Sequence, residues 1–154
     1  MKTDHLQVVT ELIHQVRFNL RIDRLESWSE KLEGISLLDL HILKLAAEHP
    51  GIVLKEIRQE LTIPHSTLTS AIDRLEGRDL LVRVISHRDR RSFELKITEK
   101  GWRIREEHDQ VDRMVAETVL NALNEEHERE VLIDLLTKIN QRLGYVSAEE
   151  LVTE

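Results

Sequence analysis

The fold is decided by the stretch LVRVISHRDRRSFELKI, residues 81–97. Its two ends, Leu81–Ile85 and Phe93–Ile97, alternate apolar and polar side chains and contain β-branched and aromatic residues, which is typical of β-strands. The residues between them, 86–92, are polar, and three of them are arginines. The stretch therefore predicts a β-hairpin with a long, basic tip.

Two short helices are predicted before the hairpin, from about Leu54 to Leu61 and from Pro64 to about Arg78, with Thr62-Ile63 as the turn between them. Proline suits the first turn of a helix because its missing N–H would have no partner there. Two short helices joined by a tight turn form a helix-turn-helix. With the hairpin after it, this unit is predicted to be a winged helix-turn-helix.

Longer helices are predicted on both sides, so the fold class is mainly α with a small β-hairpin wing. An N-terminal helix runs from about Leu6 to Leu25, and a polar linker with Ser29 and Gly34 follows it. The next helix runs from its N-cap Ser36 to about His49 and is apolar nearly all round, so we expect it to be central. Two more helices follow the hairpin, from Trp102 to about Asn121 and from Asn124 to near Gly144.

The apolar side chains of the first and last helices fall on one side of each helix. They are Leu6, Val9, Ile13, Val16 and Leu20 in the first, and Val131, Leu132, Leu135, Leu136, Ile139 and Leu143 in the last. Such faces suit packing against another chain, so these helices are predicted to form a homodimer interface.

The charge of the chain is unevenly distributed. The formal net charge is −7, but residues 50–100 contain 10 basic and 8 acidic side chains, whereas residues 101–154 contain 6 and 13. Between Arg83 and Arg91 there are four arginines and one aspartate. A positive field on one face is sufficient to bind a polyanion, so the overall acidity does not exclude DNA.

Several classes of protein are disfavoured. The chain has no cysteine, which excludes disulfides and thiolate metal sites. No apolar run is long enough for a bilayer, and the N-terminus does not resemble a signal peptide, so we expect a cytoplasmic protein without a membrane partner. A Gly-rich phosphate loop, a nucleophile elbow and a Cys-His pair are all missing, which argues against an enzyme.

The wing segment resembles that of the MarR family of bacterial regulators. The family motif is Asp-x-Arg, five spacer residues and a Leu-Thr-like pair, and Asp89-Arg90-Arg91, Ser92–Lys96 and Ile97-Thr98 match it. The match continues through Glu99-Lys100-Gly101 and covers the helix-turn-helix at residues 61–75, so it spans about Ser36 to Gly101 in detail. One departure is that Asp79 stands where the family usually has glycine, with Gly77 two residues earlier.

The resemblance implies one domain over residues 1–154. Residues 36–100 would form the winged helix-turn-helix, and residues 6–33 and 101–144 would supply the linker and the dimerisation helices. The function it implies is sequence-specific transcriptional regulation, with repression expected. A homodimer would bind a pseudo-palindromic operator in double-stranded DNA, and a small effector would modulate the affinity.

The start of the second helix-turn-helix helix carries small polar side chains, which let a recognition helix approach base edges. The predicted contacts are His65, Ser66, Thr67, Thr69 and Ser70, with Arg74 further along. Arg88, Arg90 and Arg91 are predicted to act at the wing, where arginine is favoured in a narrow minor groove. Asp89 is expected to pair with Arg91 and hold the tip rigid. Lys55 and Arg58 are candidates for phosphate contacts.

No cofactor is required on this interpretation, but zinc is one candidate effector. Four potential metal ligands stand at positions suited to leucine: Asp23, His41, His108 and Asp112. His41 is expected to face inward, Asp23 continues the seam of the first helix, and His108 and Asp112 are one helical turn apart. The pattern is similar to a site in zinc-responsive members of the family. The alternative to a metal site is that each histidine is a hydrogen-bonded core residue and that Glu106, Glu107 and Asp109 lie on a solvated face.

An organic effector is the other candidate. The available polar and aromatic groups are Arg17, Trp28 and His41, although Trp28 is equally suited to anchor the linker, and Trp102 is expected in the core under the wing. A further alternative is a winged-helix protein-interaction module that does not bind DNA. The basic wing and the polar recognition helix argue against that module.

Overall fold

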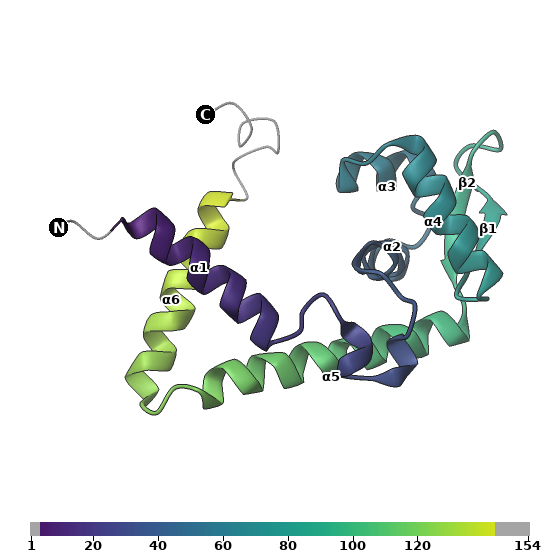
Figure 1. Cartoon of the computed structure of the whole chain (residues 1–154). Coiled ribbons are helices and arrows are strands. Elements are labelled where there is room, and N and C mark those ends of the chain that lie inside the picture. The colour runs from purple at the N-terminus through teal and green to yellow at the C-terminus, as the bar shows by residue number, and fades with distance from the viewer. Residues whose placement is uncertain (1–3, 144–154) are drawn as a thin grey trace. The chain divides into compact units, whose positions relative to one another are not determined.

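The structure is a computed structural model that describes residues 4–143 (Figure 1). The chain divides into two units, Met1–Asp112 and Arg113–Glu154. The helices and strands are α1 (His5–Asn19), the short 3-10 helices η1 (Leu25–Ser27) and η2 (Glu30–Leu32), α2 (Leu37–Glu48), α3 (Leu54–Leu61), α4 (His65–Gly77), β1 (Leu81–Ile85), β2 (Phe93–Ile97), α5 (Glu99–Asn121) and α6 (Glu126–Leu143).

The core of the first unit lies where α2, α4 and the hairpin meet. α2 contacts both α4 and β2, which confirms that it is central. Its Ile42 and Leu43 are completely buried, as are Ile72 and Leu75 of α4. Each such side chain contributes roughly 1.5–3 kcal/mol relative to exposure. This packing holds α4 against α2.

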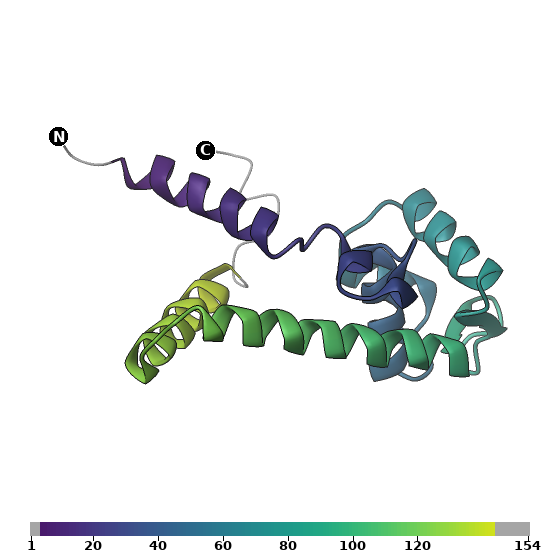
Figure 2. The same cartoon turned by 60° about the horizontal axis from the view of Figure 1, so that its bottom comes forward.

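The hairpin has the predicted bounds. β1 and β2 are antiparallel, with Leu81 opposite Ile97 and Ile85 opposite Phe93. Val53, just before α3, makes one further antiparallel bridge with Glu94 of β2. Figure 2 shows α4 beside the hairpin, as Figure 1 does from another side. The wing is therefore attached to the helix-turn-helix by backbone pairing as well as by chain continuity.

Two tight junctions flank the hairpin. Asp79 has φ +58°, so it occupies the left-handed conformation that glycine usually supplies, and its carbonyl accepts a hydrogen bond from the Thr98 hydroxyl at 2.7 Å. A Cβ on Gly101 would lie 2.0 Å from the Leu80 carbonyl oxygen. Only glycine therefore fits where the first turn of α5 packs against the residue before β1. The departure at Asp79 thus preserves the turn.

The N-terminal helix is shorter than predicted. α1 ends at Asn19 rather than near Leu25, because Arg21 takes φ +49° and the chain then enters η1. The expectation that Trp102 lies in the core is also wrong, since 44% of this residue is exposed. α5 begins at Glu99, three residues early, with the Thr98 hydroxyl accepting from the Gly101 N–H at 3.0 Å.

The apolar sides of α1 and α6 are uncovered in the single chain. Neither helix buries any of its described residues. Among the exposed side chains are Val9, Ile13 and Val16 of α1 and Val131, Leu135, Leu136, Ile139 and Leu143 of α6. None of the helices within residues 4–143 has the length and apolarity that crossing a membrane requires.

Candidate nucleic-acid interface

The first turns of α4 present the predicted polar surface. His65, Ser66, Thr67 and Ser70 are exposed and Thr69 is half-buried. Leu68, Ala71 and Ile72 on the opposite side are buried in the core, which fixes the orientation of the polar side. The first turn contains no acidic residue, so the positive end of the helix dipole is not neutralised locally. This end of α4 suits an approach to negatively charged phosphates and base edges.

The wing tip is organised by Asp89 and Ser86. The Asp89 carboxylate accepts a hydrogen bond from the Arg91 backbone N–H at 2.9 Å, and its carbonyl accepts from the Ser92 N–H and hydroxyl, both at 2.9 Å. The buried Ser86 hydroxyl accepts from the Arg88 N–H at 3.2 Å. Asp89 therefore pairs with Arg91 as expected, but its carboxylate binds the Arg91 backbone N–H rather than the guanidinium.

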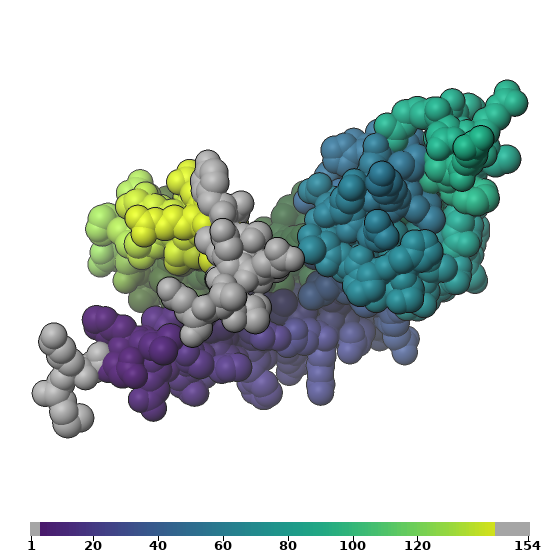
Figure 3. Space-filling view, turned by 90° about the horizontal axis from the view of Figure 1, so that it is seen from above, coloured from purple at the N-terminus to yellow at the C-terminus, as the bar shows by residue number. Residues whose placement is uncertain are grey.

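Arg90 and Arg91 remain exposed at this tip. No ion pair to either guanidinium is found within residues 4–143. In the space-filling view the green hairpin projects beyond the body of the winged region (Figure 3). Two exposed cations on a projecting, hydrogen-bonded tip suit the negative potential of a narrow minor groove.

Arg88 has an intramolecular partner instead. Its Nη2 donates to the Glu56 carboxylate at 2.6 Å and to the Gly51 carbonyl at 2.9 Å. The hydrogen bond from Arg88, and a second from the Val53 N–H, lower the pKa of Glu56 below its ordinary value, and the Glu56 carboxylate in turn raises the pKa of Arg88. Arg88 therefore fastens the wing tip to the start of α3.

Acid should loosen this attachment. A carboxyl whose pKa is lowered on folding contributes stability above its unfolded-state pKa and loses it as the pH falls through the lowered pKa. We expect wing amide exchange, corrected for its intrinsic pH dependence, to rise below about pH 4. In Glu56→Gln the step should disappear, because the amide does not titrate. An equal step in that variant would show that another group controls the wing.

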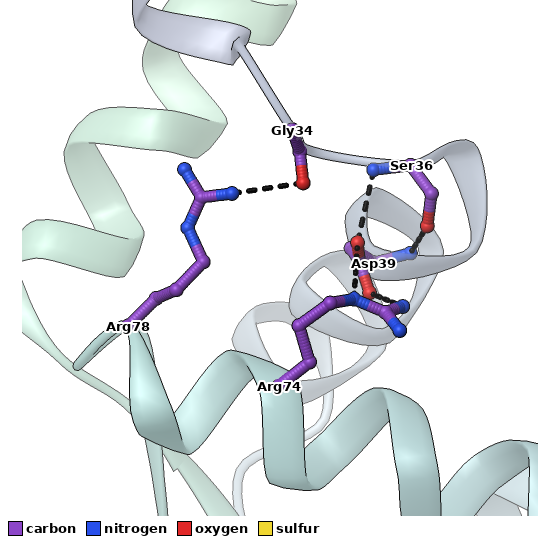
Figure 4. A network of polar contacts seen from close by, with 5 residues as sticks. All are labelled: Gly34, Ser36, Asp39, Arg74 and Arg78. Atoms are coloured by element: carbon purple, nitrogen blue, oxygen red, sulfur yellow. Dashed lines mark hydrogen bonds and ion pairs between the residues drawn. The ribbon is translucent and has the colours of Figure 1, made fainter.

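Arg74 also has an intramolecular partner. Its Nη2 lies 2.5 Å from Oδ1 of Asp39, and its Nε donates to Oδ2 at 3.3 Å (Figure 4). Arg83 of β1 ties the same helix to the wing through ion pairs with Asp73 and Glu76. Two of the predicted DNA contacts, Arg74 and Arg88, thus form intramolecular ion pairs. Arg83 connects α4 to the wing in the same way, and the sequence analysis did not identify it.

The candidate zinc ligands come together only in part. His108, Asp109 and Asp112 offer ligand atoms within 4.8 Å of one another, and Nδ1 of His108 lies 3.4 Å from Oδ2 of Asp112. His41 lines the same cavity of about 220 Å³, but it is exposed rather than inward-facing. Asp23 is not at this cavity: α1 has already ended, and its carboxylate binds Arg17 at 3.0 Å. Asp109 was predicted only as a solvated residue.

The candidate residues for an organic effector serve other contacts. Arg17 pairs with Asp23, and the Trp28 indole N–H donates to the Leu20 carbonyl at 2.8 Å, which confirms its role as a linker anchor. Of the three, His41 alone faces the cavity beside α5. Glu107, expected on a solvated face, instead accepts hydrogen bonds from Ser29 and Lys31, each at 2.6 Å, and the Lys31 contact lowers its pKa.

Comparisons with known proteins agree with this geometry. The MarR family model matches residues 35–93. The HTH-type transcriptional repressor MdtR of Bacillus subtilis (strain 168) is 28% identical over 99 residues, which cover 64% of this chain and 63% of that one, so the match spans just under two thirds of that relative.

Two solved structures have the same fold. The Streptococcus pneumoniae FabT in complex with DNA has a TM-score of 0.76 at 24% identity, with coverage of 92% of this chain and 98% of that one. The YusO protein from Bacillus subtilis has a TM-score of 0.72 at 25% identity, with coverage of 92% and 99%. The predicted winged helix-turn-helix with long flanking helices is therefore confirmed.

Proposed function

We propose that this chain, whose residues 35–93 match the MarR family model, is a sequence-specific DNA-binding repressor that acts as a homodimer. One observation carries the proposal: the exposed polar turns at the start of α4 lie beside a rigid wing whose tip presents two exposed arginines. A repressor needs both, one to read bases and one to engage the backbone and minor groove. We propose a cytoplasmic location, because the partner is chromosomal DNA.

The contacts follow from the exposed side chains. Residues His65 to Ser70 would enter the major groove, where hydroxyl and imidazole groups can bind base edges or phosphates. Arg90 and Arg91 would enter the adjacent minor groove. Lys55 and Arg58, both exposed on α3, are suited to phosphates. Arg74 and Arg88 keep their intramolecular partners.

The dimer is supported by the uncovered apolar sides of α1 and α6. In the single chain, more than half of the surface of Leu135, Leu136 and Ile139 is exposed to solvent. A second copy of the chain that packs on α6 would bury this apolar surface. Two-fold symmetry would place two copies of α4 in successive major grooves, about 34 Å apart on a pseudo-palindrome.

Fluorescence anisotropy tests the proposal. The chain is titrated onto the DNA upstream of its own gene and onto a shuffled sequence of the same composition at fixed salt. We expect affinity for the upstream DNA to be greater by about 10³-fold or more. Equal affinity for both sequences would refute sequence-specific recognition, and no binding to either would favour the protein-interaction module.

A divalent metal is a second candidate, as the effector of the same regulator. The proximity of His108, Asp109 and Asp112, with His41 on the same cavity, supports it. Imidazole and carboxylate ligands suit Zn²⁺. An organic effector in this cavity would compete with the metal for the same side chains.

Zinc should raise the melting temperature of the chain if this cavity is a metal site, since a ligand that binds only the folded state stabilises it. His108→Gln should abolish the shift, whereas His127→Gln, an exposed histidine on α6, should retain it. A shift that persists in His108→Gln, or no shift in the wild-type chain, would exclude the site. DNA affinity measured with zinc and with a chelator then shows whether the metal regulates.

A further inference from the structure

Arg74, in the last turn of α4, and Arg78, directly after the helix, bind one continuous segment of the chain, residues 33–39. Arg74 contacts Asp39, as described above, while Arg78 donates to the Gly34 carbonyl at 2.8 Å and to the Glu33 carbonyl at 2.9 Å. Figure 4 shows both guanidinium groups reaching from α4 toward this segment. The C-terminal end of the recognition helix is thus attached to the junction of the linker and α2 through its last turn and through the residue that caps it.

Asp39 is a fixed partner rather than a mobile one. It is only 1% exposed, and its Oδ2 also accepts the Ser36 N–H at 2.9 Å, in the capping box that begins α2. The Ser36 hydroxyl accepts the Asp39 N–H at 3.2 Å in return. Because the carboxylate is held by α2 on one side, it defines where the Arg74 guanidinium must lie. A buried carboxylate also needs a cation, which makes release of Arg74 unfavourable.

The Arg78 contact is equally specific in geometry. Gly34 has φ +69°, and a Cβ at this position would lie 2.9 Å from Nη1 of Arg78. Glycine therefore permits both the turn of the linker and the close approach of the guanidinium. A side chain at position 34 would displace the guanidinium from its present place.

We propose that Asp39, Arg74 and Arg78 are positioning residues for DNA recognition, and that Arg74 does not contact DNA. They orient α4 so that His65–Ser70, about one to two and a half turns before Arg74, meet the base edges. Arg74 is 45% exposed at its side chain, yet both donors that face Asp39 are engaged. This inference rests on the proposed function, because it concerns the residues that hold α4 in position to read DNA.

Salt titration separates positioning from contact. Each phosphate contact that is lost flattens the slope of log K against log salt concentration by about 0.9. In Arg74→Gln we expect specific affinity to fall about tenfold, comparable to the loss of one base contact, while non-specific affinity and the salt slope are unchanged. A flattened slope would mean that Arg74 binds phosphate, and an unchanged specific affinity would mean that it positions nothing; either result overturns the proposal.

A double-mutant cycle tests the pair. In Asp39→Asn the side-chain carbonyl can still accept the Ser36 N–H, but Arg74 loses its ionic partner. We expect the double variant Asp39→Asn/Arg74→Gln to lose no more specific affinity than Arg74→Gln alone, because residues that act as a unit are not additive. Additive losses would overturn the coupling. If Arg74→Gln fails to fold, Arg74→Lys replaces it, because lysine keeps a cation beside Asp39. We expect Arg74→Lys to show the same reduced specific affinity and an unchanged salt slope.

The exposed ion pair between Glu99 and Arg103 of α5 supplies the matched control. Glu99→Gln and Arg103→Gln should leave specific affinity and salt slope unchanged. The wild-type chain separates this inference from the proposed function. If it does not discriminate its upstream DNA, the function fails; if it does and Arg74→Gln behaves like the control, the positioning role alone fails.

Discussion

The chain carrying Leu135→Asp is expected to be a monomer that has lost operator affinity by at least about 100-fold. Leu135 lies in the apolar stripe of α6 and is 51% exposed in the single chain. At a dimer interface its replacement would bury an unpaired carboxylate, which costs several kcal/mol. Two linked half-site contacts typically gain 10²- to 10⁴-fold in affinity over one, and a monomer forfeits that gain.

Sedimentation and anisotropy measured on the same samples check this prediction. Gln141→Asp is the matched control, because it adds the same charge to the polar side of the same helix, where the side chain is exposed. It should remain dimeric and bind as the wild-type chain does. A Leu135→Asp chain that stays dimeric, or a monomer that retains full affinity, would contradict the assignment of α6 to the dimer interface.

Arg90→Ala is expected to give the second-largest loss. The Arg90 guanidinium is exposed on a tip held by Asp89 and Ser86, so its removal should leave the hairpin intact. Each wing would lose one cation near the phosphates, and the salt slope should flatten by about 0.9 for each of the two wings of a dimer. We expect about 1–3 kcal/mol of binding free energy to be lost per wing where the arginine lies in the groove.

Arg103→Ala removes the same side chain from the exposed surface of α5 and is the control for charge alone. It should leave the slope as in the wild-type chain. An Arg90→Ala slope that matches the control would show that the wing tip does not approach the phosphates. Arg91→Ala, measured beside Arg90→Ala, would then show which of the two exposed arginines carries the contact.

Local sequence rules were sufficient for the winged region. The bounds of β1 and β2 followed from alternating β-branched residues, and the turn at Thr62-Ile63 followed from the proline after it. Ser36 and Asp39 marked the start of α2 because a capping box depends on residues three apart. Asp79 shows the limit of a motif, since aspartate adopts the left-handed conformation that the usual glycine would supply.

The partners of charged side chains could not be predicted, because they join residues far apart in the sequence. Arg74 binds a carboxylate 35 residues away, and Arg88 binds one 32 residues away. Spacing placed both arginines on the surface of a DNA-binding unit but gave no sign that Asp39 or Glu56 would meet them. His41 was misplaced for a related reason: its register with Leu38 and Leu45 indicated burial, yet those leucines are themselves only half-buried.

The early end of α1 had no clear local signal. Leu20 continues the apolar seam, but Arg21 at φ +49° ends the helix before Asp23. The Trp28 indole then binds the Leu20 carbonyl that the helix leaves without a helical partner. A contact between residues eight apart thus accompanies the end of the helix, and the chain beyond that end carries Asp23 away from the proposed metal site.

A hydroxyl-radical footprint of the chain on its own upstream DNA tests whether two winged helices bind the DNA as a two-fold pair. We expect two protected blocks whose centres lie one helical turn, about 10–10.5 base pairs, or a whole number of turns apart, with minor-groove protection beside each from the wing. Protection beside each block should fade in Arg90→Ala while the blocks themselves remain. A single block, or no protected sequence at concentrations that saturate the DNA, would contradict recognition by a two-fold pair of winged helices.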